Sequence, residues 1–383
     1  MALEPLVPTP LPAPGTENLE MPTLEEIHHV ALGIRSACLD GPTLTPLQRT
    51  VLEALTESMT GVRIPAGEFE PISAADFAKG LAGRNEGFRM RMVQVMELGR
   101  MILDDPSEEV SARVIEFAVE LSMPDDLIEQ MREFVSSSRV LVASDIDRST
   151  YIANLDLSGF TPLRSDDDKF HAWANTVIRP ELEAKWRALG DLPKGTLGRG
   201  VFDFYQARGF YFPGEEGSAP PILAQHDWVH VLADYGSMVE SELEVFAFIC
   251  RASHDPQAFT LLAMVIKLFQ TGELDGAAGI FEPDAGHLEA EGMPERLGDA
   301  FRRGALTTGQ PEFLATDWWS LADKPLDEVR EMFNVVPKAE SAIAAGSVSP
   351  WEAGGISPFQ DVAGRELAEA EGRVYDSFGA SVA

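Results

Sequence analysis

The sequence predicts an all-α protein with two helical parts, between a flexible proline-rich start and a flexible end rich in Ala, Gly and Glu. Three observations predict this fold class. Apolar residues recur every three or four positions over much of the chain, which places them on one face of a helix. No run of alternating strands is visible. The chain also lacks a repeat of fixed period and a nucleotide-binding glycine motif.

Residues 1–22 are expected to form a disordered tail. Their prolines are Pro5, Pro8, Pro10, Pro12, Pro14 and Pro22. Each proline fixes a backbone angle and removes a hydrogen-bond donor, so a helix or a central strand cannot form there.

Residues 23–155 are expected to form an N-terminal helical bundle. Four apolar stripes with helical spacing run along it. They are Leu47/Val51/Leu55/Met59, Met92/Met96/Gly99/Leu103, Val110/Val114/Phe117/Leu121 and Leu127/Met131/Phe134. Acidic and proline-containing turns separate the later stripes, where the next helix would begin. Asp40-Gly41 followed by Thr45-Pro46-Leu47 bears a faint likeness to the helical domain of tellurite-resistance-type proteins, and the bundle is otherwise unassigned.

A second helical part, residues 165–337, follows a boundary at Asp156–Asp168 that is rich in turn residues and charge. Its expected helices are His171–Leu189, Leu223–Tyr235, Ser237–Ala252, Gln257–Thr271 and Leu326–Phe333. Residues 338–383 are rich in Ala, Gly, Ser and Glu, and we expect them to be loosely packed, with Trp351 and Phe359 as docking points.

Composition excludes some classes of protein. The 383 residues include 62 acidic and 30 basic side chains, a net charge of −32, which argues against a nucleic-acid binder and against adhesion to an anionic membrane by charge. Two cysteines, Cys38 and Cys250, cannot form a disulfide framework, so a reducing, cytoplasmic setting is expected. The longest apolar run, Phe259–Ile266, is too short to span a bilayer. Peripheral contact with a membrane and homo-oligomerisation both stay open.

The segment from Gln225 to Glu242 carries the chemistry. On a helix, His226, His230 and Asp227 would lie at roughly 0°, 40° and 100° around the axis. Two imidazoles one turn apart and a carboxylate can bind a divalent metal. From spacing alone, a hydrogen-bonded pair of core histidines is an equally good interpretation.

Glu242 is the expected fourth ligand, because its helical neighbours are apolar and an unpaired buried carboxylate is unfavourable. In one straight helix it would lie about 18 Å from His230. A turn at Gly236 would let the second helix fold back. Ser237 and Glu240 fit a capping box, which predicts an exposed Glu240. Asp234 is a competing ligand.

HDxxH, with a Glu twelve residues after the second His, resembles the signature of the coenzyme Q biosynthesis protein 4 family. Flanking segments over about residues 165–336 are also similar to that family. They are Leu192–Arg199, Val201–Tyr205, Ala300–Gly304, Asp317–Trp319 and Pro325–Arg330. Ser241 stands where we expect glycine in the family.

The resemblance implies an all-helical, lipid-binding protein that holds a metal through His226, Asp227, His230 and Glu242. Zinc is the expected ion, and manganese or iron(II) also suit such a set. The resemblance also implies an enzyme of ubiquinone biosynthesis that decarboxylates a polyprenylated aromatic head group, with or without oxidation. Expected partners are an isoprenoid lipid and other quinone-biosynthesis proteins.

Two other functions stay open. One is a lipid-binding scaffold of a biosynthetic complex with a structural metal, and the other is an HD-type phosphohydrolase, which needs a further upstream His and a distant Asp. The loop Gly195–Gly200 would present backbone N–H groups and Arg199 to an anion, such as an isoprenoid phosphate or a substrate carboxylate. A flexible loop that enters a helix is the alternative.

Overall fold

The computed structural model describes residues 22–23, 25–60, 62–67, 69–103, 106–124, 178–216, 218, 224–253, 258–270, 286–309 and 311–380. The expected stripe at Leu127–Phe134, the expected boundary at Asp156–Asp168 and nearly all of the expected tail lie outside these residues. Within the described residues the fold is all-α, as predicted, with no β-strand.

The N-terminal helices are α1 (Ile27–Cys38), α2 (Pro46–Thr60), α3 (Ala74–Gly80), α4 (Glu86–Met101) and α5 (Glu108–Glu120). Three of the expected stripes run along α2, α4 and α5, and nearly all of their residues are buried. Ser73, Asn85 and Ser107 cap α3, α4 and α5, each by accepting a hydrogen bond from a backbone N–H in the first turn.

The later helices are α9 (Pro180–Arg187), α10 (Leu197–Arg208), α11 (Ala224–Ala233), α12 (Val239–Ala252), α13 (Ala258–Gln270), α14 (Met293–Ala305), α15 (Leu326–Phe333), α16 (Glu340–Ala344) and α17 (Pro358–Ala370). Short 3₁₀ turns lie at η2 (Ala188–Asp191), η3 (His287–Glu289), η4 (Phe313–Ala315) and η5 (Trp318–Leu321). The spacing predicted α11, α12, α13 and α15 to within a few residues.

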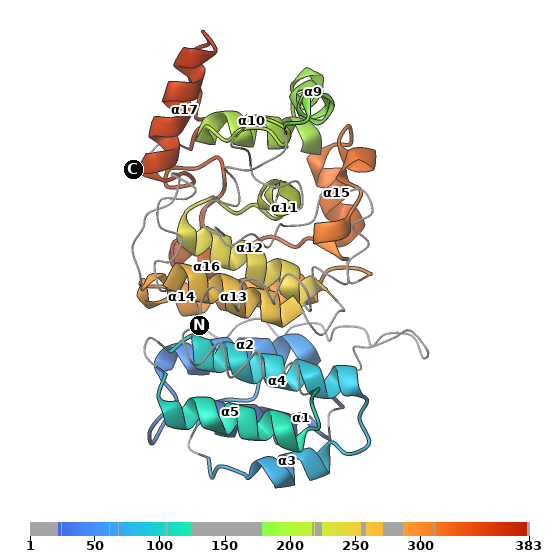
Figure 1. Ribbon diagram of the computed structural model, residues 1–383, viewed down its shortest axis with the longest axis vertical. Coiled ribbons are helices and arrows are strands. Elements are labelled where there is room, and N and C mark those ends of the chain that lie inside the picture. Colours follow the sequence, from blue (N-terminus) through green and yellow to red (C-terminus); the bar gives the residue numbers. More distant parts are fainter. Residues whose placement is uncertain are drawn as a thin grey trace.

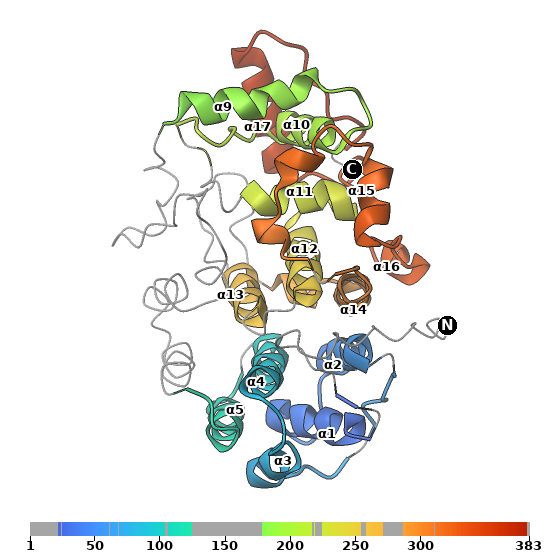
Figure 2. The same cartoon turned by 90° about the vertical axis from the view of Figure 1, so that its right-hand side faces the viewer.

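The helices are stacked in layers (Figures 1 and 2). The N-terminal helices lie at one end, and α9, α10 and α17 lie at the other. Between them, α12 packs on α13 and α14, and these two helices contact α4 and α2 respectively. Helix α11 lies between this middle layer and α10, so the segment expected to carry the chemistry is enclosed on both sides.

The two helical parts share one core. A continuous cluster of buried apolar side chains extends from α1 to α15. Hydrogen bonds also connect the N-terminal helices with the second helical part. The buried Arg251 of α12 donates from Nε to Ser58 Oγ on α2 at 2.7 Å. Arg91 of α4 donates to the carbonyl of Ser253 at 3.3 Å.

The expectation that residues 338–383 are loosely packed is wrong for residues 338–380. Helix α17 packs against α10, and Ser357 and Gln360 at its start are fully buried in a capping box. Trp351 contacts Phe204 of α10, as a docking point should, whereas Phe359 is 45% exposed. Composition did not reveal this packing because many of its contacts are hydrogen bonds between residues far apart in the sequence.

None of the described helices has both the length and the apolar composition that a membrane-spanning segment needs.

Candidate metal centre

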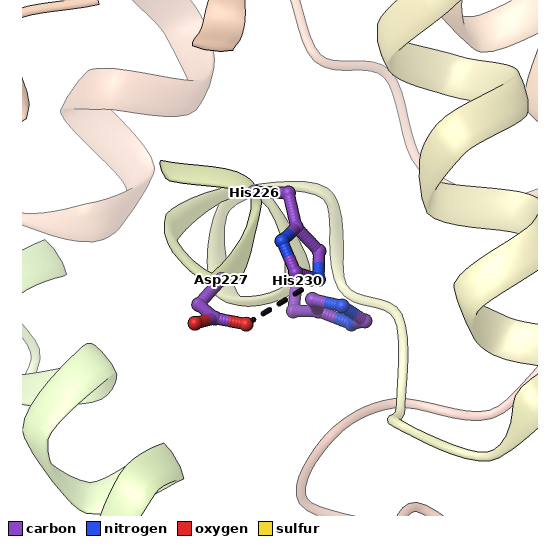
Figure 3. A group of neighbouring side chains, drawn as sticks. All are labelled: His226, Asp227 and His230. Atoms are coloured by element: carbon purple, nitrogen blue, oxygen red, sulfur yellow. Dashed lines mark ion pairs between the residues drawn. The ribbon is translucent and has the colours of Figure 1, made fainter. Parts of the chain in front are cut away.

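Helix α11 presents His226, Asp227 and His230 on one side (Figure 3). A ligand atom from each lies within 4.8 Å of the others. The opposite side of the helix is apolar, and Trp228 stacks on Trp318 with their ring centroids 6.0 Å apart. Large buried rings therefore fix the rotation of α11 about its axis, and with it the direction of the three polar side chains.

Glu242 joins this group from α12. Its Oε2 atom lies 3.2 Å from His226 Nε2 and 3.2 Å from His230 Nε2. A turn interrupts the helical segment between α11 and α12, and it lies around Gly236 as expected. The second helix then folds back, so the structure brings all four predicted residues together. Their role as metal ligands remains a prediction.

The expected capping box at Ser237 is wrong. The N-cap of α12 is Met238, and the Ser237 hydroxyl instead donates to Gln360 Oε1 at 2.6 Å. Glu240 is not free to cap, because its Oε1 lies 2.9 Å from His287 Nδ1 and its side chain is only 18% exposed. A long-range partner has replaced the local hydrogen bond that the motif predicts.

Asp234, the competing ligand, pairs elsewhere. Its carboxylate lies 3.5 Å from Lys338 Nζ and 3.8 Å from an Arg330 nitrogen. Its backbone is left-handed, with φ of 65°, a conformation that Asp tolerates better than most residues. Asp234 therefore ends α11 and is paired with cations outside the group of four.

Two further groups orient the site. Tyr205 of α10 donates its hydroxyl to Asp227 Oδ2 at 2.5 Å. His230 Nδ1 lies 2.7 Å from the carbonyl oxygen of Gly236, to which it donates. This bond keeps a proton on Nδ1 and turns Nε2 toward Glu242. Such contacts are typical of metal-binding residues.

Burial and the two histidines act in opposite directions on the pKa values of Glu242 and Asp227. Burial alone would raise the pKa of Glu242, but His230 and His226 hold that pKa well below its ordinary value. Burial raises the pKa of Asp227, against the opposing effect of the same two histidines. Burial and Asp227 both raise the pKa of Tyr205. Tyr205 therefore stays a proton donor, and two buried carboxylates face two imidazoles.

The walls around the imidazoles are aromatic. Phe246 stacks on His226 with the ring centroids 5.0 Å apart, and Phe204 lies 5.2 Å from His230 by the same measure. His230 and Glu242 are almost fully buried, whereas the His226 side chain is 16% exposed. Among the four side chains, that of His226 is the most exposed to solvent.

The anion-binding interpretation of Gly195–Gly200 is not supported by the backbone. The N–H of Leu197 donates to Lys324, that of Gly198 to Ala322, and those of the next two residues to Thr196. Arg199 donates from Nε to Asp203 at 2.8 Å and from NH1 to the Gly190 carbonyl at 3.0 Å. The loop is the capped start of α10, and these donors are already paired.

A scan against protein-family models finds no match, and a search of curated proteins finds none either. Among solved structures, the chain matches a crystal structure named "Putative ubiquinone biosynthesis protein" from Nostoc punctiforme PCC 73102. The identity is 18% and the TM-score 0.29, over 65% of this chain and 98% of that chain. Values this low establish neither a shared family nor a shared function.

Proposed function

We propose that His226, Asp227, His230 and Glu242 bind one divalent metal ion. The main support is the approach of Glu242 Oε2 to within 3.2 Å of both Nε2 atoms. Asp227 Oδ1 lies 3.5 Å from His226 Nε2, so Asp227 and Glu242 both approach the histidine pair. Burying two carboxylates beside each other is unfavourable unless a cation compensates them. The donor set therefore fits a metal.

Zinc is the ion we propose, because two imidazoles and two carboxylates suit its preference for mixed nitrogen and oxygen ligands. Manganese and iron(II) accept the same donors. When bound, the ion would act as a Lewis acid and stabilise negative charge on a phenolate or carboxylate.

The substrate we propose is an aromatic ring with a polyprenyl tail, and the reaction is removal of a ring carboxylate. The support is the sequence resemblance around HDxxH and Glu242, together with the rings of Phe246 and Phe204 beside the histidines. Apolar walls exclude water and strengthen electrostatic interactions with a bound anion. If the removal is oxidative, the oxidant is molecular oxygen or a partner acceptor, since zinc is not redox-active.

The residues of this chain have separate tasks in that scheme. Tyr205 holds Asp227 in one orientation, and the Gly236 carbonyl holds the ring of His230. Phe246 covers one face of His226 and limits access of water to that ligand. These contacts fix the donors before any substrate arrives, which lowers the reorganisation that binding requires.

The test is elemental analysis of the natively purified protein. We expect close to one equivalent of metal per chain, lost in the His226→Ala/His230→Ala double variant. Glu240→Gln is a matched control, because Glu240 lies on the same helix as Glu242 but pairs with His287. Metal-free wild-type protein, or product formation by protein stripped of metal, would contradict the proposal.

A non-catalytic scaffold with a structural metal is the second candidate. It is favoured by one observation: four protein donors would complete a tetrahedral zinc shell without an open position. This candidate predicts that metal removal unfolds the second helical part, whereas the enzyme predicts a folded but inactive apoprotein. The phosphohydrolase is not favoured, since no additional His or Asp joins the cluster among the described residues.

A further inference from the structure

A stretch of the C-terminal segment, residues 348–360, runs along the turn that joins α11 to α12. The Gly236 N–H donates to the carbonyl of Val348 at 3.0 Å, and the Ser237 N–H donates to the carbonyl of Gly355 at 3.0 Å. The turn therefore pairs its backbone with residues more than a hundred positions later. Residues 348–360 lie outside the part of the chain that resembles a known family.

Gln360 closes this contact from α17. Its Nε2 donates to the carbonyl of Ser237 at 2.8 Å, and its Oε1 accepts from the Ser237 hydroxyl at 2.6 Å. Both side chains are fully buried. If one of the two side chains were removed, the polar atoms of the other would lose hydrogen bonds that water could not replace in this buried position.

Arg208 of α10 joins the turn and the segment from the other side. Its Nε donates to the Ser237 hydroxyl at 2.5 Å, and its NH2 donates to the carbonyls of Gly355 and Pro350 at 2.8 and 3.1 Å. The guanidinium lies over the ring of Phe204, 3.7 Å from its centroid. A fully buried cation with this many acceptors holds three segments in one arrangement.

This turn sets the relation between the two helices of the candidate metal centre. Its Gly236 carbonyl accepts from His230 Nδ1 at 2.7 Å. On its other side, the N–H of Glu242 donates to the carbonyl of Met238 at 2.9 Å, in the first turn of α12. A shift of the turn would thus move the His230 ring and the Glu242 carboxylate relative to each other.

We propose that residues 348–360 brace this turn and position His230 and Glu242 for metal binding, with Gln360 and Arg208 as positioning residues. The proposal rests on the metal-binding function proposed above. It gives the C-terminal segment a task at the centre, although none of its residues is among the four expected ligands.

The test compares Gln360→Ala with wild-type protein, using Zn²⁺ alone in competition with a chelator. We expect a 10- to 100-fold weaker affinity, the range found when groups that orient metal ligands are removed. The visible spectrum of the Co²⁺-loaded protein should change, since it reports ligand geometry. In the metal-free protein, exchange of the Gly236 and Ser237 amide protons should accelerate. Arg365→Ala, on the exposed face of α17, should change none of these measurements.

Gly236→Ala disturbs the same contact from the turn. A Cβ there would lie 3.0 Å from the Gly355 carbonyl oxygen, so the segment must move and affinity should fall as in Gln360→Ala. Wild-type affinity and Co²⁺ spectrum in both variants would overturn the proposal, as would failure of both to fold. If wild-type protein binds no metal, the proposed function fails. The role of residues 348–360 is then tested by amide exchange alone, and unchanged exchange in Gln360→Ala would contradict it.

Discussion

The hydroxyl oxygen of Tyr205 lies 2.5 Å from Oδ2 of Asp227, in a fully buried contact between α10 and α11. The other carboxylate oxygen, Oδ1, lies 3.5 Å from His226 Nε2. Tyr205 therefore occupies one side of Asp227 and leaves the other side turned toward the histidines. Stacking of Tyr205 on Phe212, with ring centroids 5.3 Å apart, fixes the donor itself.

Tyr205→Phe should weaken Zn²⁺ binding about 10-fold or more, because Asp227 loses the hydrogen bond that orients it. The ring and its packing remain, so the protein should stay folded. Tyr211→Phe is the matched control, since the Tyr211 side chain is 49% exposed. Affinities from chelator competition decide the matter, and equal affinities in the two variants would show that Tyr205 has no orienting role.

Local spacing was sufficient to place the predicted residues. His226, Asp227 and His230 share one side of a helix because a helix turns by about 100° per residue. Glu242 reaches them because the turn at Gly236 lets α12 fold back. The apolar neighbours of Glu242 in the sequence place it on the buried side of α12. Both features are visible within a window of eighteen residues.

The groups that orient these residues were not predictable in the same way. Gln360 bonds to Ser237 across 123 positions in the chain, and Tyr205 bonds to Asp227 from α10, a helix that was not among those expected. The Ser237 side chain fits a local capping box by spacing alone. It makes other bonds because Arg208 and Gln360 are brought to it by the tertiary fold.

Gly33→Ala should destabilise the N-terminal helices by about 3 kcal/mol, because overpacking a filled core forces side chains or backbone to move. A Cβ at Gly33 would lie 2.1 Å from the ring of Phe77, and Phe77 is fully buried against Phe117. Chemical denaturation followed by circular dichroism measures the change.

Gly83→Ala is the control for this substitution, since a Cβ there meets no atom within 4 Å. Its effect should stay within about 0.5 kcal/mol. If Gly33→Ala is as stable as Gly83→Ala, the close packing of α1 against Phe77 is wrong.

The ion pair between Glu26 and Arg84 should make stability depend on acidity. The hydrogen bonds from Arg84 lower the pKa of Glu26 from 4.5 to about 2. A depressed carboxyl pKa stabilises the folded state above the unfolded value, and this contribution is lost as pH falls toward the folded value. Glu26→Gln should thus be less stable than wild type by about 1 kcal/mol at pH 6, after allowance for solvent screening.

This difference should begin to shrink below about pH 4.5 and should nearly vanish near pH 2, because the wild-type carboxyl is then protonated too. Unfolding free energies of the two proteins at several pH values give the curve directly. Glu116→Gln removes an exposed carboxylate from α5 and should show almost no difference at any pH. A Glu26→Gln difference that stays constant from pH 6 to pH 2 would mean that its cause is lost packing and that the charge of Glu26 does not contribute.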